Sequence, residues 1–438
     1  MSNHKFGVAL LGFGTVGTGV YNLLQRQTKQ IQEKYGFGFE VRKILVRDPN
    51  KRGRFISLPK KLLAKNINEI LSDQSIDVVV EVMGGDHPTK SYIIDSLKAG
   101  KHVITANKRL CGSDGETLVA KARQHGKFFG FAAAVTGFNQ FVPSIVNSVT
   151  IKSVAGIFNG TSNYILTRME EDGLSAADAL REAQVKGYAE ADPKEDIDGL
   201  DTRNKLIVVS RLAFGKFLKV DDILAKGIRD ISKIDMELAS ELGYTIKLLG
   251  ISRREDDTVQ AVVRPCLVPK DDSLASVKGV NNGIKVYDEL RGVQSMTVAG
   301  AGSNPTSMAI FSDLISMAKG DKILWPPAEN PNLKFSKSEW PSKYYLRIQV
   351  ANQPGVLAKV TKAFGKSGIN IVDVWQKGDN NLQDVPVVLI CGPTIERNVR
   401  QALRTIEAIT LASPVLIRVE DPSAHLKECG FEVAATNA

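Results

Sequence analysis

A glycine-rich turn between a strand and a helix constrains the fold of this chain more than any other feature. The apolar run Phe6–Leu11 predicts a strand, and a helical pattern follows through about Lys34. Between them the spacing G-x-G-x-x-G places glycines for a tight turn, for close approach of backbone amides to a pyrophosphate, and for close packing of helix on strand. The candidate cofactor-binding residues are Gly12, Phe13, Gly14, Thr15, Val16 and Gly17. An ordinary tight turn is the simpler alternative.

The residues after the second predicted strand bear on the choice of cofactor. The strand Glu40–Val46 ends in Arg47-Asp48, and more basic residues follow. An acidic residue at this place binds the ribose 2′-hydroxyl of NAD, whereas an arginine accommodates the 2′-phosphate of NADP. Arg47 therefore favours NADP(H), and Asp48 leaves NAD(H) open.

Two further strands, Ile76–Val82 and His102–Thr105, alternate with helical segments, which predicts a doubly wound parallel sheet. Ligands of such sheets lie at the carboxyl ends of the strands. We therefore expect Thr105 and Lys108 at the edge of the cofactor site. A solvated loop charge is the simpler interpretation of Lys108.

The stretch Ala183–Lys205 surrounds a Gly/Pro-punctuated turn with carboxylates and ends in a lysine that opens an apolar run. Asp201 is predicted to be the N-cap of a buried helix. Burial and the positive end of the helix dipole would both favour the neutral form of Lys205 and bring its pKa toward the range useful for proton transfer. The alternative is a surface ion pair between Asp201 and Lys205.

Composition bounds the remaining possibilities. A chain of 438 residues suggests about three domains. The net charge of +9 is spread along the chain, which suits an anionic cofactor better than nucleic acid, and no apolar run is long enough for a membrane span. The four cysteines show no metal-binding spacing and no nucleophile setting, and no signal peptide is recognised, so we expect a cytoplasmic location.

The C-terminal part predicts a separate small module. Residues 321–342 are rich in Pro and Asn and are expected to be a linker. The strands and helices predicted after it, from Tyr344 to Val419, follow the order βαββαβ of a ferredoxin-like fold.

Several motifs resemble the homoserine dehydrogenases. The pattern A-x3-G-Y-A-x2-D-P-x2-D-I-x-G-x-D-x3-K is filled by Ala183, Gly187, Tyr188, Ala189, Asp192, Pro193, Asp196, Ile197, Gly199, Asp201 and Lys205. The runs TANK, ending at Lys108, and GIFNGTSNYIL are also similar to the family. Asn352-Gln353-Pro354-Gly355 looks like the ligand turn of an ACT regulatory domain.

The resemblance implies an α/β protein with a Rossmann-type NAD(P)-binding domain (1–148, with a return of about 299–320) and an α+β catalytic and dimerisation domain with a mixed sheet (149–320). The linker (321–342) and an ACT domain (343–421) follow. It implies interconversion of L-homoserine and L-aspartate 4-semialdehyde with NAD(P)(H), in threonine and methionine biosynthesis. A threonine effector and a homodimer or homotetramer are also implied.

The resemblance also implies roles for individual residues. Glu190 would bind the substrate ammonium, and Asp196 and Asp201 would orient substrate or lysines. Lys108 and Lys205 would flank the reacting oxygen, and we expect Lys205 to be the acid/base.

The chain departs from the family at a few positions. Ala132 replaces the glutamate of the family's monovalent cation site, so no metal site is expected, and Phe138-Asn139-Gln140 replaces the family's Gly-Ile-Pro. Asn352 stands where the ACT turn usually has aspartate. These departures leave open a catalytically silent or substrate-altered relative that senses amino acids or nucleotides.

Overall fold

The chain divides into two compact units, each assembled from segments that are far apart in the sequence. The structure is a computed structural model, and it describes residues 4–48, 58–135, 138, 141–300, 303–326, 331–337, 340–376 and 382–420. The first unit comprises residues 1–149, 204–221 and 298–331, and the second comprises 150–203, 222–297 and 332–438. Among the described residues, no helix is long and apolar enough to cross a membrane.

The first unit contains the predicted parallel sheet. Among the described residues it has six strands in the order β3-β2-β1-β4-β5-β6, and every neighbouring pair is parallel. This is the strand order of a Rossmann-type dinucleotide-binding fold. The strands are β1 (His4–Leu11), β2 (Phe37–Leu45), β3 (Leu63–Ala64), β4 (Val78–Glu81), β5 (His102–Thr105) and β6 (Phe129–Gly130).

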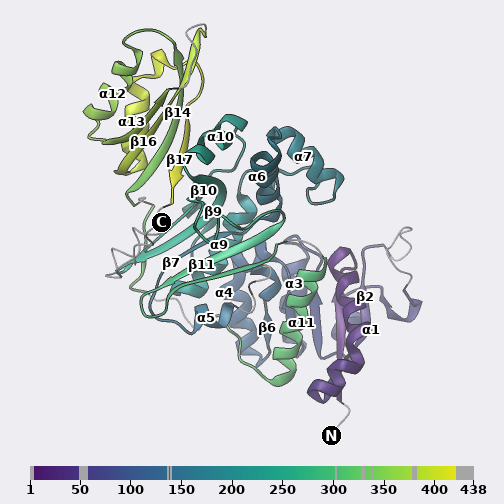
Figure 1. Ribbon diagram of the computed structural model, residues 1–438. Coiled ribbons are helices and arrows are strands. Elements are labelled where there is room, and N and C mark those ends of the chain that lie inside the picture. The colour runs from purple at the N-terminus through teal and green to yellow at the C-terminus, as the bar shows by residue number, and fades with distance from the viewer. Residues whose placement is uncertain are drawn as a thin grey trace. The chain divides into compact units, whose positions relative to one another are not determined.

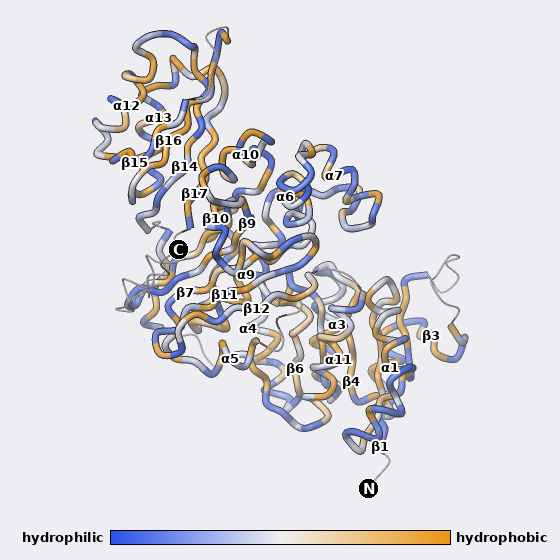
Figure 2. The backbone as a smooth tube through the Cα atoms, in the orientation of Figure 1, coloured by the Kyte–Doolittle hydropathy of each residue, from blue (hydrophilic) through white to orange (hydrophobic). Residues whose placement is uncertain are grey.

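Helices cover this sheet and complete its core. Strand β4 is buried along its whole length, as expected of a strand with helices on both faces. Helix α1 (Thr15–Tyr35) packs against both β2 and α11 (Ser303–Lys319), so a late segment of the chain joins the core made by the early strands. Figure 1 shows α11 in green among the purple and blue elements, and in Figure 2 the sheet strands are the more hydrophobic part of this unit. The other helices here are α2 (Asn68–Leu71), α3 (Thr89–Lys98), α4 (Lys108–Gln124) and α5 (Val142–Val146).

The second unit is built on a mixed sheet, as predicted. Its described strands follow the order β12-β11-β7-β9-β10-β17-β14-β16-β15. The part nearest the start of this path comprises β7 (Ile151–Ile157), β9 (Tyr244–Glu255), β10 (Thr258–Pro269), β11 (Asn281–Asp288) and β12 (Gly292–Ala299), with β8 (Leu224–Ala225) and β13 (Lys334–Phe335) paired to β10. Its helices are α6 (Gly160–Asp172), α7 (Ala176–Val185), α8 (Lys194–Ile197) and α10 (Lys233–Glu241).

The C-terminal strands and helices follow the predicted βαββαβ order. They are β14 (Ser342–Ala351), α12 (Val356–Lys366), β15 (Ile371–Gln376), β16 (Asp384–Thr394), α13 (Glu396–Thr405) and β17 (Val415–Val419). The sheet order β17-β14-β16-β15 is that of the ferredoxin-like fold. Helices α12 and α13 cover one face of this sheet, as Figure 1 shows. Their apolar residues join those of the sheet in one core.

This C-terminal module shares a continuous sheet with the rest of the second unit. Strand β17 pairs in parallel with β10, and Cys266 stands opposite Arg418. Next to this pairing the guanidinium of Arg264 and the carboxylate of Glu396 form a buried ion pair. Such a pair is costly to break, because the partner would be left as an uncompensated buried charge.

Helix α9 (Leu200–Phe214) begins two residues earlier than the sequence predicted, since an N-cap at Asp201 would place its first helical residue at Thr202. The prediction that Asp201 is its N-cap is therefore wrong, because Asp201 already lies in the first helical turn. The preceding Gly199 has φ = 77°, a backbone conformation that glycine adopts without strain, and it allows the chain to enter the helix at Leu200. An acidic residue in the first turn still interacts favourably with the helix dipole.

Candidate functional site

The glycine turn has the geometry that its sequence predicted. Gly12 has φ = +104°, and a Cβ there would lie 2.8 Å from the carbonyl oxygen of Val82. A Cβ at Gly17 would lie 2.5 Å from the carbonyl oxygen of Gly12. Side chains at these two positions would therefore force the strand and helix apart.

Gly14 differs from the other two glycines, because open space lies where its Cβ would be. Gly14 is the N-cap of α1 and provides no side-chain cap for the first amides of the helix, and both Gly14 and Thr15 are exposed. A helix start with exposed and uncapped amides fits an anionic pyrophosphate. Phe13 turns away from this start and packs edge-on against Tyr21, with ring centroids 5.8 Å apart. Val16 is half-buried.

Arg47 lies two residues beyond the end of β2 and is exposed. Asp48 beside it is exposed as well, whereas Lys51, Arg52 and Arg54 lie outside the described residues. The guanidinium of Arg47 is therefore accessible to a charged group at this edge of the sheet.

A buried carboxylate that sequence reasoning missed organises the next two loops. Glu81 ends β4, is fully buried, and accepts hydrogen bonds from the amides of Met83 and Gly84 at 2.7 and 3.0 Å. Its other oxygen accepts a bond of 2.5 Å from the hydroxyl of Thr105. Burial raises the pKa of Glu81, and these three hydrogen bonds oppose that rise.

The same network reaches the start of α4. The Thr105 hydroxyl accepts a 3.0 Å bond from the amide of Asn107, whose side chain donates to Gly85 O at 2.7 Å. Asn107 also caps α4 by accepting from the amide of Leu110. Lys108 is the first residue of this capped helix and is half-buried, so it is not a solvated loop charge.

Lys205 lies in the second turn of α9 and only 3% of it is exposed. The residues that follow it, Leu206 to Val209, are all buried, so this helix is enclosed on several sides. Asp201 stands one helical turn earlier and is 4% exposed. The predicted burial of Lys205 is confirmed, and a surface ion pair between the two residues is excluded.

The acidic turn separates into a half-buried Asp196 and a buried Asp201, which share one partner, and an exposed Glu190. The side-chain amide of Asn159 donates to the carboxylates of both Asp196 and Asp201, at 2.6 and 2.9 Å. Asn159 also caps α6, which begins at Gly160, by accepting from the amide of Ser162. By contrast Glu190 is exposed.

The segment in which the chain departs from the family is partly described. Ala132 lies in a short 3₁₀ helix, η2 (Ala132–Val135), and its amide donates to the carboxylate of Asp313 at 2.9 Å. Phe138 is buried, whereas Asn139 and Gln140 lie outside the described residues. Among the described residues, no group of three or more His, Cys, Asp or Glu side chains is placed to hold a metal ion.

The described cysteines are poor nucleophiles. Cys111, Cys266 and Cys391 are free and buried, and burial raises the pKa of each thiol, that of Cys391 to about 12. Since the thiolate is the reactive form, these three residues do not suit an aldehyde-oxidising mechanism.

A Rossmann-type sheet with an open glycine turn and a ferredoxin-like C-terminal module define a nicotinamide-nucleotide-dependent oxidoreductase with an attached regulatory fold. Three family profiles match in the same order. They are described as homoserine dehydrogenase, NAD binding domain (residues 12–131), homoserine dehydrogenase (140–315) and ACT domain (344–408).

Individual relatives agree with the profiles. The chain is 36% identical to a homoserine dehydrogenase of Pseudomonas aeruginosa, over 94% of this chain and 98% of that one. It is 35% identical to one of Bacillus subtilis, over 87% and 90%. The crystal structure of a homoserine dehydrogenase from Thiobacillus denitrificans has a TM-score of 0.88 at 34% identity and covers 95% of this chain and 99% of that one. The chain therefore belongs to the homoserine dehydrogenase family, oxidoreductases that act on a CH–OH group.

Proposed function

We propose that Lys205 is the acid/base of homoserine dehydrogenase chemistry in this chain, in which L-homoserine and L-aspartate 4-semialdehyde are interconverted with NADP(H) as the preferred cofactor. The burial of Lys205 carries this proposal. A buried amine loses hydration of its charged form, which is the condition for giving up and regaining a proton near neutral pH. This is the chemistry that an alcohol oxygen needs when a hydride leaves the adjacent carbon.

The glycine turn supports the binding of a dinucleotide. Gly12 and Gly17 allow the close packing, and the exposed Gly14 and Thr15 stand at the start of α1, where a pyrophosphate would meet the positive end of the helix. The nicotinamide cofactor supplies the hydride acceptor. Thr105, which is buried, is proposed to hold the edge of the cofactor site through its hydrogen bonds to Glu81 and Asn107. The exposed Arg47 is proposed to meet the 2′-phosphate, which gives the preference for NADP(H) over NAD(H).

The remaining residues are proposed to hold the amino acid and tune the lysines. Glu190 binds the substrate ammonium, and Asp196 and Asp201 orient substrate or lysines. Lys108 gives electrostatic support to the reacting oxygen. Two ammonium groups near one oxygen raise the cost of protonating each other, so at least one should titrate low.

The test replaces Lys205 by alanine and measures turnover by the absorbance of the reduced nicotinamide. We expect kcat to fall by about 10²-fold or more, with cofactor affinity nearly unchanged. Lys101→Ala is a matched control, because Lys101 is also a buried lysine of the first unit but bonds to the carbonyl oxygens of Asp73 and Ile76. If Lys205→Ala retained full turnover, the assignment would be wrong.

We further propose that the C-terminal module, residues 343–421 after the linker 321–342, binds threonine as a regulatory effector. The turn before α12 supports this, since Gly355 is its N-cap in a left-handed conformation with φ = 84°. Asn352 anchors the turn through a 3.1 Å bond from its side-chain amide to Leu382 O. Inhibition assays with and without threonine, on the intact chain and on Asn352→Ala, test the proposal. An equal response of the two proteins would contradict it.

The proposed limits of the other domains are 1–148, with a return of about 299–320, and 149–320. We propose a homodimer or homotetramer in the cytoplasm. Strand β12 supports self-association, because it is an edge strand that leaves Val293 47% exposed, next to Leu290 at 79%. Light scattering after size-exclusion chromatography would measure the oligomer size.

A further inference from the structure

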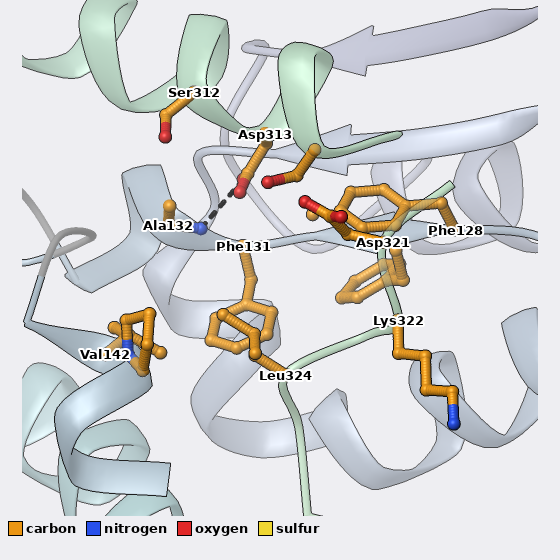
Figure 3. Close-up of a pocket in the computed structure, with 13 residues that line it drawn as sticks. Phe128, Phe131, Ala132, Val142, Ser312, Asp313, Asp321, Lys322 and Leu324 are labelled. Carbon is orange, nitrogen blue, oxygen red and sulfur yellow. Dashed lines mark hydrogen bonds between the residues drawn. The ribbon is translucent and has the colours of Figure 1, made fainter. Parts of the chain in front are cut away.

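A cavity of about 350 Å³ in the first unit lies apart from the glycine turn, and one side of it is formed by the segment around Ala132 in which the chain departs from the family. It lies between the segment after β6, the start of α5, helix α11 and the segment that follows α11, as Figure 3 shows. This volume lies within the range of small-molecule sites, roughly 300–1,000 Å³. Its lining residues are Phe128, Phe129, Gly130, Phe131, Ala132, Val142, Pro143, Ser312, Asp313, Ser316, Asp321, Lys322 and Leu324.

One wall of the cavity carries a carboxylate with spare hydrogen-bonding capacity. Asp313 receives a single hydrogen bond within the described part of the chain, from the amide of Ala132 to its Oδ2. A carboxylate accepts about four bonds, so capacity remains for a ligand. Gly130 makes room for this side chain, since a Cβ there would lie 2.7 Å from Oδ2 of Asp313.

The opposite wall is apolar. In Figure 3 Phe131, Val142 and Leu324 lie together on the side away from Asp313. Asp321 turns its carboxylate toward the interior of the view, whereas Lys322 extends away from it. A ligand that satisfies both walls needs a cationic donor at one end and an apolar body at the other.

We propose that this cavity binds a small amphipathic amine, with its ammonium on Asp313 and its apolar body against Phe131 and Leu324. An organic ammonium fits better than a metal ion, because a metal ion would need several oxygen ligands and most of this lining is aromatic or aliphatic. An anionic ligand is disfavoured, since two carboxylates and only one lysine line the cavity.

Burial also sets the protonation state on which the proposed binding depends. It raises the pKa of Asp313 to about 7, and the bond from Ala132 opposes that rise. The other ionisable groups nearby are Asp321, Lys322 and the thiol of Cys111, whose raised pKa keeps it neutral. Ammonium binding should therefore strengthen as pH rises through 7, because the carboxylate becomes ionised.

Isothermal titration of the intact chain with benzylamine, benzyl alcohol and benzoate tests the proposal, since the three probes share a body and differ in charge. At pH 8 we expect benzylamine to bind at least about tenfold more tightly than benzyl alcohol, with no measurable binding of benzoate. Between pH 8 and pH 6 the affinity for benzylamine should fall about tenfold, because the ionised fraction of a group with this pKa falls by that factor. Equal binding of benzylamine and the alcohol, or no binding, would overturn the proposal.

Three variants locate the site. Asp313→Asn keeps the shape and an acceptor for Ala132, and should remove the preference for the amine while the alcohol binds as before. Leu324→Trp should weaken both ligands by filling the apolar end, and the 38% exposure of Leu324 favours tolerance of the larger side chain. Lys322→Met is the matched control and should leave benzylamine binding unchanged. An unchanged amine preference in a folded Asp313→Asn protein would refute the assignment, whatever the result of the dehydrogenase assays.

Discussion

Replacement of Thr105 by valine tests whether the buried network around Glu81 holds the two loops of the proposed cofactor site. Valine has nearly the same shape as threonine, but it removes the hydroxyl that donates to Glu81 and accepts from Asn107. A hydrogen bond to a charged group contributes roughly 1.5–3 kcal/mol, and a buried amide left without an acceptor costs roughly 1–3 kcal/mol. Because the two costs overlap when the site relaxes, we expect a local destabilisation of about 3 kcal/mol.

Hydrogen exchange followed by mass spectrometry measures this local effect at the two loops themselves. A loss of about 3 kcal/mol corresponds to exchange that is on the order of 10²-fold faster. The peptides to follow are those that contain the amides of Met83, Gly84 and Asn107, since these amides donate within the network.

The chain offers a matched control for this experiment. Thr89 is also fully buried, but its hydroxyl makes one bond of 2.8 Å to a neutral acceptor, the carbonyl oxygen of Gly84. Thr89→Val should cost about 1 kcal/mol, or about fivefold faster exchange. Thr105→Ser keeps the hydroxyl and should stay close to the unmodified protein. If Thr105→Val accelerated exchange no more than Thr89→Val, the central place given to Glu81 would be mistaken.

The pH dependence of the same variant has a defined sign. Burial raises the pKa of Glu81 in the folded state, so ionisation of this group costs stability and the cost is relieved as pH falls. The bond from Thr105 opposes the rise, so Thr105→Val should raise this pKa further. The difference in exchange between the variant and the unmodified protein should therefore shrink as pH is lowered and Glu81 becomes protonated.

Three other predictions follow from the geometry. Gly17→Ala should disrupt the packing of the first unit, since its Cβ would lie 2.5 Å from Gly12 O. Gly14→Ala has room for its Cβ, so it should fold normally and only weaken cofactor binding. Circular dichroism measures the folding of each variant, and cofactor titration measures the binding. Lys247 is fully buried, and burial lowers its pKa from 10.5 to about 8 in the folded protein. The free energy of unfolding should therefore rise by about 3 kcal/mol as pH increases from below 8 to above 10.5, because the folded state loses this proton first. Urea titrations of Lys247→Met should lack this rise. A thiol-blocking reagent applied to the folded protein should leave activity intact and should react slowly at Cys391, because the thiol of Cys391 is buried and neutral. Rapid inactivation together with modification of Cys391 would contradict this prediction.

Elements with a clear local pattern could be predicted from the sequence. Strand β5 spans His102–Thr105 and the C-terminal module has the order βαββαβ, both as predicted. By contrast β9, which is the longest partner of β10, was not predicted. Its residues Thr245–Ser252 are buried without alternation, and a run of this kind does not distinguish a strand from a buried helix segment. Its pairing with β10 over the whole strand and with β7 over part of it makes it a strand.

The candidate site was predictable only as far as each residue acts alone. Gly12 and Lys205 could be found because a tight turn and a buried lysine leave local signals. Glu81 and Asn159 could not, because their importance comes from partners that the fold supplies: Thr105 is 24 residues from Glu81, and Asp201 is 42 residues from Asn159. In both places one buried polar side chain holds two separate segments, so removal of its charge or amide disturbs both segments together. Each single substitution in such a network leaves a buried partner without its hydrogen bond, so the free-energy changes of two substitutions should not add. A double variant of Glu81 and Thr105 should therefore lose less stability than the sum of the losses in the two single variants.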